Sequence, residues 1–194
     1  MYWRTARGST VITVVVIDMQ NAYFEDPALG RLQDELVEAC NALIAAARSS
    51  GANVLLVKTE HERDKSTWTL NMLEDNQGFI FRGSEQAEFV PGLATAGLPQ
   101  LVKTRDSAFL GTDLLWRLRN WESDTIVLAG VSTHNCVAQT GADAFGHNIR
   151  VVYATEATGS EDRDSAEALL SILSREYRQE TLSLPQIEAL LDGR

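Results

Sequence analysis

Residues 125–136, TIVLAGVSTHNC, contain the pattern that decides the fold. The run Thr125–Gly130 is apolar without alternation, which is typical of a strand that is covered on both faces. Helical spacing follows over Cys136–His147. Because a strand followed directly by a helix is the repeating unit of a parallel sheet, this stretch predicts an α/β protein.

The same unit recurs along the chain. Further apolar runs lie at Val11–Ile17, Asn53–Lys58, Leu101–Lys103, Ile149–Ala154 and Thr181–Leu184. Helical patterns lie at Arg31–Ser50, Thr112–Trp121 and Asp162–Glu180. We therefore predict a doubly wound parallel sheet in one domain over residues 1–194, since 194 residues suit a single hydrophobic core.

Composition narrows the class of partner and the compartment. The chain has 27 acidic and 17 basic residues, a formal net charge of -10, with 44% hydrophobic and 23% charged residues, as in soluble globular proteins. An acidic surface repels phosphate groups, so we predict neither a nucleic-acid nor a membrane partner. The apolar run before Asp18 is too short for a secretory signal or a membrane span, which favours a cytoplasmic protein.

Residues 59–99 interrupt the alternation of strands and helices with a long stretch of little periodicity. A loop of this length in a compact domain is usually functional, so we expect a lid over a site or a contact between subunits. His61 and Trp68 lie within it.

Three chemically complementary residues stand at the ends of predicted strands. Asp18 closes the first, Lys103 closes the third and Cys136 follows the fourth. Ligands of doubly wound sheets bind beyond the carboxyl ends of the strands, where these side chains can converge. An acid, a base and a thiol in one cleft are the components of an activated sulfur nucleophile.

The local physics supports that assembly. A free thiol titrates near pH 8.5, and a helix N-terminus or a nearby ammonium group lowers this pKa to roughly 3.5–7.5. We therefore expect Lys103 and the following helix to lower the pKa of Cys136, and Asp18 to take the thiol proton or activate water. Each residue also has a plain structural explanation: Cys136 as a packed hydrophobe, Asp18 as a turn cap and Lys103 as its salt-bridge partner.

Three segments resemble the signature blocks of the isochorismatase-like cysteine hydrolase superfamily, which includes N-carbamoylsarcosine amidohydrolase, nicotinamidase and ureidoacrylate amidohydrolase. They are VVVIDMQNAYF around Asp18, VKTRDSAFLGTDLLWRLR from Val102 and LAGVSTHNCVAQT through Cys136. A weaker block, FRGSEQAEFVPGL, resembles a Gly-rich segment of the family. The resemblance extends over nearly the whole chain.

This resemblance implies a Rossmann-like three-layer fold with a six-stranded parallel sheet flanked by helices, assembled as a homodimer or homotetramer. Cys136 would be the nucleophile that forms a thioester, Asp18 the general base and acid, and Lys103 the group that holds their charges. The Val131–Ser132 peptide falls where the family has a non-proline cis bond. The amides of Ser132 and Cys136 would then form the oxyanion hole.

One departure from the family bears on metals and substrate. Nicotinamidases carry an Asp-x-His and a further His that bind a metal, whereas KTEHERDKSTW has Thr59 at the aspartate position and only His61. We therefore predict no metal and no cofactor. True isochorismatases, which hydrolyse a vinyl ether, generally lack the cysteine, so Cys136 favours amide chemistry.

Candidate substrate contacts are aromatic residues and histidines near the expected cleft. Phe24, Trp68 and Phe109 are predicted pocket walls, while His61 and His134 are predicted to contact substrate or to pack within their loops.

Together these features predict a metal-independent cysteine amidohydrolase acting on a small amide, ureide or lactam through a thioester on Cys136. The alternatives are an isochorismatase-type vinyl-ether hydrolase and a catalytically silent relative that binds a metabolite.

Overall fold

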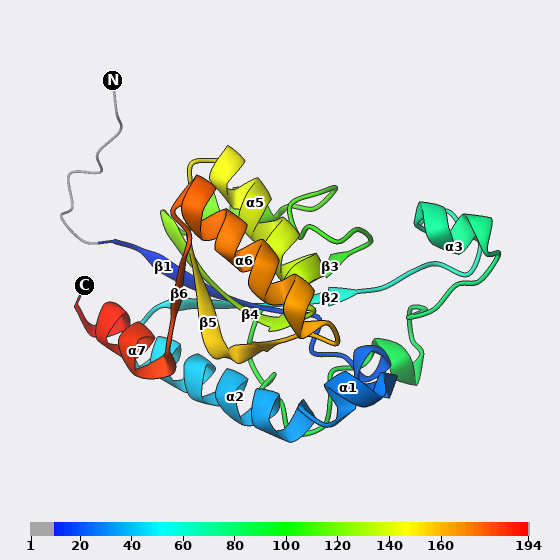
Figure 1. Cartoon of the computed structure of the whole chain (residues 1–194), viewed down its shortest axis with the longest axis horizontal. Coiled ribbons are helices and arrows are strands. Elements are labelled where there is room, and N and C mark those ends of the chain that lie inside the picture. The colour runs from blue at the N-terminus through cyan, green and yellow to red at the C-terminus, as the bar shows by residue number, and fades with distance from the viewer. Residues whose placement is uncertain (1–9, 194) are drawn as a thin grey trace.

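Six strands form one parallel sheet in the order β3-β2-β1-β4-β5-β6 in the computed structural model, which describes residues 10–193 (Figure 1). The strands are β1 (Ile12–Ile17), β2 (Asn53–Thr59), β3 (Gln100–Lys103), β4 (Thr125–Val131), β5 (Arg150–Gly159) and β6 (Glu180–Leu182). The strand order reverses between β1 and β4. This reversal is the switch point at which doubly wound sheets bind their ligands.

Helices cover both faces of the sheet and complete the three layers (Figure 1). The helices α1 (Pro27–Gly30), α2 (Gln33–Ser49) and α7 (Leu184–Asp192) lie on one side. On the other side are α4 (Leu114–Asn120), α5 (Ala138–Gly146) and α6 (Arg163–Tyr177). None of the helices described between residues 10 and 193 combines the length and the apolar character needed to cross a bilayer.

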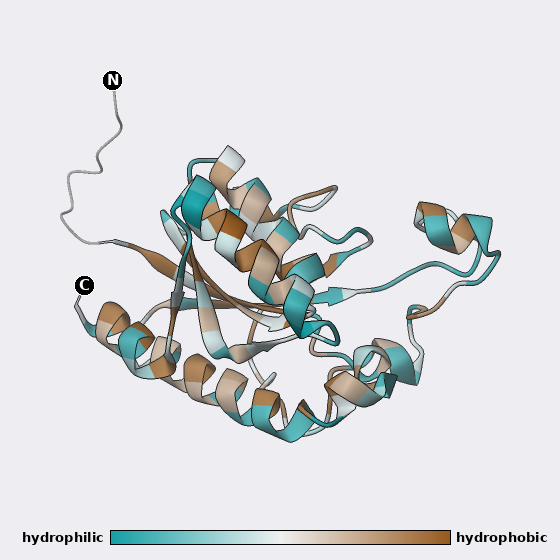
Figure 2. Ribbon diagram, in the orientation of Figure 1, coloured by the Kyte–Doolittle hydropathy of each residue, from teal (hydrophilic) through white to brown (hydrophobic). Residues whose placement is uncertain are grey.

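Strand β1 shows why the apolar runs are continuous. All its residues are buried, with Val14 and Val16 packed toward α2 and Val15 and Ile17 toward the opposite helices. Since successive side chains of a strand point to opposite faces, a strand between two helical layers needs an apolar residue at nearly every position. The apolar residues accordingly gather in the central strands in Figure 2.

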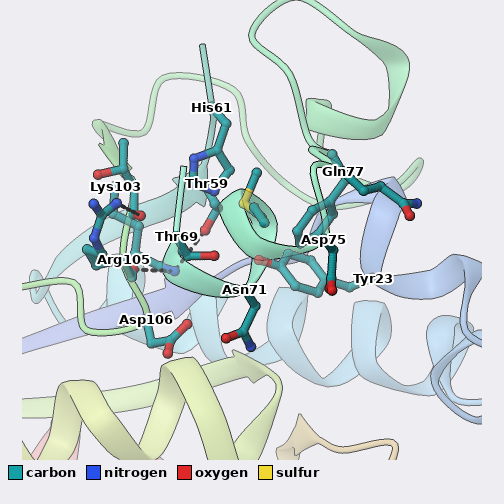
Figure 3. A pocket seen from close by; sticks show the side chains of 13 residues that line it. Tyr23, Thr59, His61, Thr69, Asn71, Asp75, Gln77, Lys103, Arg105 and Asp106 are labelled. Atoms are coloured by element: carbon teal, nitrogen blue, oxygen red, sulfur yellow. Dashed lines mark hydrogen bonds between the residues drawn. The ribbon is translucent and has the colours of Figure 1, made fainter. Parts of the chain in front are cut away.

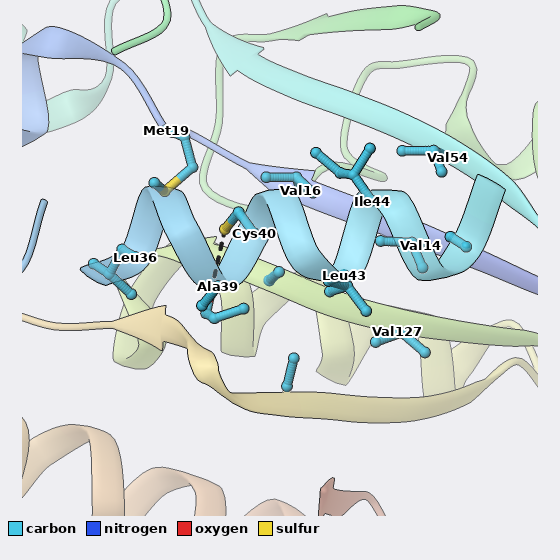
Figure 4. Close-up of a cluster of buried hydrophobic side chains, with 14 of the residues drawn as sticks. Val14, Val16, Met19, Leu36, Ala39, Cys40, Leu43, Ile44, Val54 and Val127 are labelled. Carbon is cyan, nitrogen blue, oxygen red and sulfur yellow. Dashed lines mark hydrogen bonds between the residues drawn. The ribbon is translucent and has the colours of Figure 1, made fainter. Parts of the chain in front are cut away.

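Helix α2 packs one apolar stripe against the sheet (Figure 4). Leu36, Cys40, Leu43 and Ala47 recur at helical spacing and are buried. Cys40 is fully buried, its thiol contacts the Ala157 carbonyl oxygen at 3.7 Å, and burial raises its pKa to about 12. This cysteine is a packing residue with no reactive character.

The predicted α/β fold is confirmed, with differences at the edges of elements. Strand β5 continues to Gly159, five residues beyond the apolar run, because its register with β4 shifts between Leu128 and Gly130 and pairing then resumes. Helix α7 was not predicted, although Ser183 and Gln186 form a capping box at its start. Cys136 precedes α5 in a π-helical turn over Thr133–Val137.

Residues 60–99 leave the sheet after β2 and return as β3, and their role as a lid or a subunit contact stays a prediction. They contain the short helix α3 (Leu70–Glu74), which stands apart from the helical layers in Figure 1, and a 3-10 turn over Glu85–Ala87. Gln20 fixes the base of this segment: its side-chain amide donates to the carbonyl oxygens of Thr59 and Ala87, both at 2.8 Å, and accepts from the Thr59 N–H at 2.7 Å.

Strands β1 and β4 approach closely at the switch point, and Gly130 permits that approach. Gly130 has a φ of 106°, and a Cβ there would lie 1.9 Å from the Ile17 carbonyl oxygen. Neither the backbone conformation nor the space tolerates a side chain.

We expect Gly130→Ala to lower the free energy of unfolding by at least about 3 kcal/mol, because the methyl group must push two paired strands apart. Urea unfolding followed by circular dichroism measures the change. The matched control is Gly146→Ala at the end of α5, where an added Cβ meets nothing within 4 Å. Equal midpoints for the two variants would contradict the steric explanation.

Candidate active site

Asp18, Lys103 and Cys136 meet at the carboxyl edge of the sheet. Asp18 follows β1, Lys103 ends β3 and Cys136 lies in the π-helical turn after β4. Their exposed fractions are 0%, 1% and 4%, respectively. Because they follow β1 and β4, Asp18 and Cys136 flank the switch point, where the fold is expected to bind a ligand.

The ammonium group of Lys103 joins the other two side chains. Its Nζ lies 2.8 Å from Asp18 Oδ2 and 3.3 Å from Cys136 Sγ. It also donates to Thr59 Oγ1 at 2.8 Å and to the Arg105 carbonyl oxygen at 3.1 Å. A buried ammonium group is costly unless all its protons are paired, and these four contacts satisfy it.

Thr59 completes the polar network. Its hydroxyl accepts the hydrogen bond from Lys103 and donates to Asp18 Oδ1 at 3.0 Å, and it is also hydrogen-bonded to the phenol of Tyr23. Burial, then the Asp18 charge, raise the pKa of Tyr23, so this phenol is neutral. From the sequence, Thr59 was predicted only to occupy the position of a missing metal ligand. Its place at the end of β2, next to the strand that Asp18 follows, was the signal for its role in the network.

The backbone aims Asp18 into the site. Its φ is 55°, a left-handed conformation that Asp adopts more readily than most residues, and its N–H donates to the Val57 carbonyl oxygen at 2.8 Å. The chain thus turns sharply at the end of β1 while staying bonded to β2. The carboxylate is held toward Lys103 as a result.

The thiol of Cys136 is protonated in the free site, contrary to the expected lowering of its pKa. Burial is the largest effect and the negative charge of Asp18 the next, and both raise the pKa of Cys136 well above its ordinary value; Lys103 opposes them without prevailing. Burial lowers the pKa of Lys103, but the charge of Asp18 and the contact with Cys136 outweigh it, so the net shift is upward and the ammonium form is kept. Formation of the thiolate therefore requires its proton to pass to a neighbouring carboxylate.

The turn that carries Cys136 is fixed to the end of β5. The Val131–Ser132 peptide bond is cis, at the position that the resemblance indicated. Thr133 Oγ1 donates to the Gly159 carbonyl oxygen at 2.9 Å, and Ser132 Oγ donates to Glu161 Oε2 at 2.5 Å. The unpredicted extension of β5 thus supports the nucleophile turn. The oxyanion role of the Ser132 and Cys136 amides stays a prediction.

A cavity of about 360 Å³ opens beside Lys103 (Figure 3), and neither Asp18 nor Cys136 is among the residues that line it. Polar residues dominate its lining: Tyr23, Thr59, His61, Thr69, Asn71, Met72, Asp75, Gln77, Phe79, Lys103, Thr104, Arg105 and Asp106. Lys103 and Asp106 lie nearest the nucleophile, with Asp106 Oδ1 3.9 Å from Cys136 Sγ. Arg105 and Asp106 had no role in the sequence prediction, although they stand two and three residues after Lys103.

His61 is the predicted substrate contact that lines this cavity. Its Nδ1 donates to the Thr67 carbonyl oxygen at 2.9 Å, since a carbonyl can only accept. Burial is the main cause that lowers the pKa of His61, and the charges of Arg105 and Lys103 add to it. The ring is therefore neutral at pH 7 and has its second nitrogen as an acceptor.

The other predicted contacts do not line the cavity. Phe24 belongs to the core under α2. Trp68 packs against Phe81 and donates from Nε1 to the Glu62 carbonyl oxygen at 2.8 Å. Phe109 packs against His147 with ring centroids 5.0 Å apart.

His134, the last of these candidates, faces the chain after β5. Its Nδ1 lies 2.7 Å from Ser160 Oγ, and its Nε2 lies 3.7 Å from Glu161 Oε1. A histidine two residues before the nucleophile is thus directed at the neighbouring loop.

The donor set beside His61 does not fit a metal of the nicotinamidase kind. Such a site needs three protein ligands, and among residues 10–193 no three His, Cys, Asp or Glu side chains come together for one. Thr59, at the position of the missing aspartate, directs its hydroxyl to Asp18.

Comparison with known proteins decides the family. The model of the isochorismatase domain matches residues 13–181. The chain belongs to the isochorismatase-like hydrolase family. A structure of an isochorismatase family protein from Desulfovibrio vulgaris superposes with a TM-score of 0.84 at 30% identity, covering 96% of this chain and 100% of that one.

Two curated relatives of this isochorismatase-like hydrolase differ in activity. A probable inactive nicotinamidase of Arabidopsis thaliana is 33% identical over 76% of this chain and 80% of its own length. A maleamate amidohydrolase of Pseudomonas putida is 31% identical over 73% of this chain and 68% of its own length. The family therefore includes a relative named as an amidohydrolase and one named as probably inactive.

We expect Lys103→Met to raise the apparent pKa of Cys136 by about one unit or more, because the substitution removes the cation that lowers it. Alkylation by iodoacetamide near neutral pH then slows at least about tenfold, and its dependence on pH measures the shift. The matched control is Lys58→Met, one residue before Thr59 on β2, where the lysine pairs with Glu60 outside the cavity. An unchanged profile in Lys103→Met would contradict the electrostatic role.

Proposed function

We propose that this protein is a metal-independent cysteine amidohydrolase that cleaves a C–N bond of a small amide, ureide or lactam through a thioester on Cys136. The observation that carries the proposal is the contact of one buried ammonium group, Lys103 Nζ, with both Asp18 and Cys136 Sγ. A packing cysteine such as Cys40 has no such partner among the described residues. A maleamate amidohydrolase among the relatives also supports amide chemistry.

The first half-reaction begins with a proton transfer. The Cys136 thiol gives its proton to Asp18, which conserves the total charge of the buried triad while Lys103 stays positive. The thiolate attacks the carbonyl carbon, and the negative charge that develops on oxygen is stabilised by the amides of Ser132 and Cys136. Asp18 returns the proton to the nitrogen, the C–N bond breaks, and ammonia or an amine leaves the thioester.

The second half-reaction restores the enzyme. Asp18, again a carboxylate, takes a proton from water as the water attacks the thioester carbonyl. Collapse of this intermediate breaks the C–S bond and releases a carboxylic acid, and the proton returns to sulfur. In this mechanism, Lys103 holds its position through both halves because its contacts with Thr59 Oγ1 and the Arg105 carbonyl oxygen do not change during the reaction.

The cavity limits the substrate to a small polar molecule. Its volume of about 360 Å³ is at the low end for ligand sites, and Arg105, Asn71 and His61 offer polar partners along its wall. A nucleic acid or a membrane remains an unfavourable partner for a chain with a net charge of -10.

A homodimer or homotetramer, located in the cytoplasm, completes the proposal. Large apolar residues on the surface, Leu70, Leu110 and Trp116, are 68%, 59% and 69% exposed and offer area for self-association.

We expect Cys136→Ala to abolish the release of ammonia or amine from a panel of primary amides, ureides and a lactam, because no thioester can form. A coupled ammonia assay measures this release. Cys40→Ala removes the other cysteine and should retain turnover, since Cys40 lies on the buried face of α2 and does not line the cavity. Amide turnover that survives Cys136→Ala would contradict covalent catalysis through sulfur, and silence of the native protein toward every substrate would favour the vinyl-ether hydrolase or the metabolite-binding relative.

We expect incubation with a chelator to leave amide hydrolysis within about twofold of the untreated rate, because the proposed chemistry uses only protein groups. The assay is repeated after dialysis and after addition of Zn²⁺. Loss of activity that Zn²⁺ restores would overturn the metal-independent mechanism.

A further inference from the structure

A second carboxylate faces the nucleophile from the cavity side. Asp106 Oδ1 lies 3.9 Å from Cys136 Sγ, and Asp106 lines the cavity (Figure 3), whereas Asp18 is fully buried and is not among the lining residues. The proposed mechanism does not use Asp106. Any scissile group that reaches the sulfur from the cavity passes beside this carboxylate.

Asp106 is held in place before substrate arrives. Its Oδ2 accepts a hydrogen bond from Gln139 Nε2 at 3.1 Å, and the same nitrogen donates to Asn135 Oδ1 at 3.0 Å. The preceding residue, Arg105, accepts from Lys103 Nζ through its carbonyl oxygen at 3.1 Å. One carboxylate oxygen is thus anchored to α5, and the other is directed at Sγ.

The distance of 3.9 Å matches the geometry of an amide in attack position. In that position the carbonyl carbon lies roughly 3–3.5 Å from the sulfur, and the scissile nitrogen is bonded to this carbon at about 1.33 Å. From its position, Asp106 Oδ1 can accept a hydrogen bond from that nitrogen. A carboxylate cannot donate, and it repels the carbonyl oxygen that becomes negative in the intermediate.

We propose that Asp106 is a specificity-determining residue that accepts a hydrogen bond from the N–H of the scissile amide and so orients the group for attack. The substrate class is then amides and ureides that keep at least one N–H on the scissile nitrogen. Esters and groups with a negative charge beside the reacting carbon are disfavoured. This inference rests on the proposed amidohydrolase function and deepens it.

Two alkylating reagents test Asp106 without knowledge of the substrate. The thiolate displaces iodide from iodoacetamide and from iodoacetate, which differ only in carrying an amide or a carboxylate beside the reacting carbon. Both rates are measured at the same pH in each variant, so the fraction of thiolate cancels in their ratio, and each rate is divided by that of a small free thiol. Variants with different thiol pKa values are then comparable.

We expect the normalised ratio of iodoacetamide to iodoacetate rates to exceed one in the native protein. We expect Asp106→Asn to lower this ratio at least about tenfold. Iodoacetamide loses its hydrogen bond to a charged acceptor, and iodoacetate is no longer repelled by a carboxylate. The matched control is Asp75→Asn, which changes the same charge on another part of the cavity wall and should alter the ratio by less than about twofold (Figure 3).

Two results would overturn the role of Asp106: a ratio in Asp106→Asn within about twofold of the native value, or an equal fall in Asp75→Asn. Because the ratio is read from alkylation, it is independent of turnover. Failure of the proposed function would instead be seen as amide hydrolysis that is absent or that survives Cys136→Ala.

Discussion

The burial of the Lys103 ammonium group is the constraint on which the site depends. A cation with 1% exposure is stable only if its surroundings supply charge and acceptors, and here a carboxylate, a hydroxyl, a carbonyl and a thiol do so. Each of these partners comes from a different part of the carboxyl edge of the sheet. The same contacts that make the lysine tolerable therefore assemble the reactive groups.

The sheet topology makes this convergence possible. Strand order reverses between β1 and β4, so the chain leaves these neighbouring strands toward opposite faces and a crevice opens between them. Gly130 lets the two strands pair up to the point where the crevice begins. Gly130 thus contributes to the position of Cys136, because it fixes the end of β4, the strand that Cys136 follows.

The fold and the three central residues were predictable because their signals are local. Continuous apolar runs mark strands buried on both faces, and a charged residue directly after such a run marks a strand end. Thr59 stands at a strand end like Asp18, but its uncharged side chain attracted no notice, and nothing near Asp106 in the sequence shows that it meets Cys136. The pKa of Cys136 was predicted with the wrong sign because burial, a property of the folded chain, outweighs the charge of Lys103. Phe24, Trp68 and Phe109 were placed on pocket walls by residue type alone, and packing partners far along the chain determined their positions.

The side chain of Gln20 links the end of β1 to β2 and to the turn before residue 88, and it bonds main-chain atoms there. Its partners are the N–H and carbonyl of Thr59 and the carbonyl of Ala87. A contact of this kind is indifferent to side-chain identity at its partners. The exposed side chains of residues 60–99 can therefore change without loosening this attachment to the carboxyl edge of the sheet. Such an arrangement separates the evolution of substrate choice from the upkeep of the reacting groups.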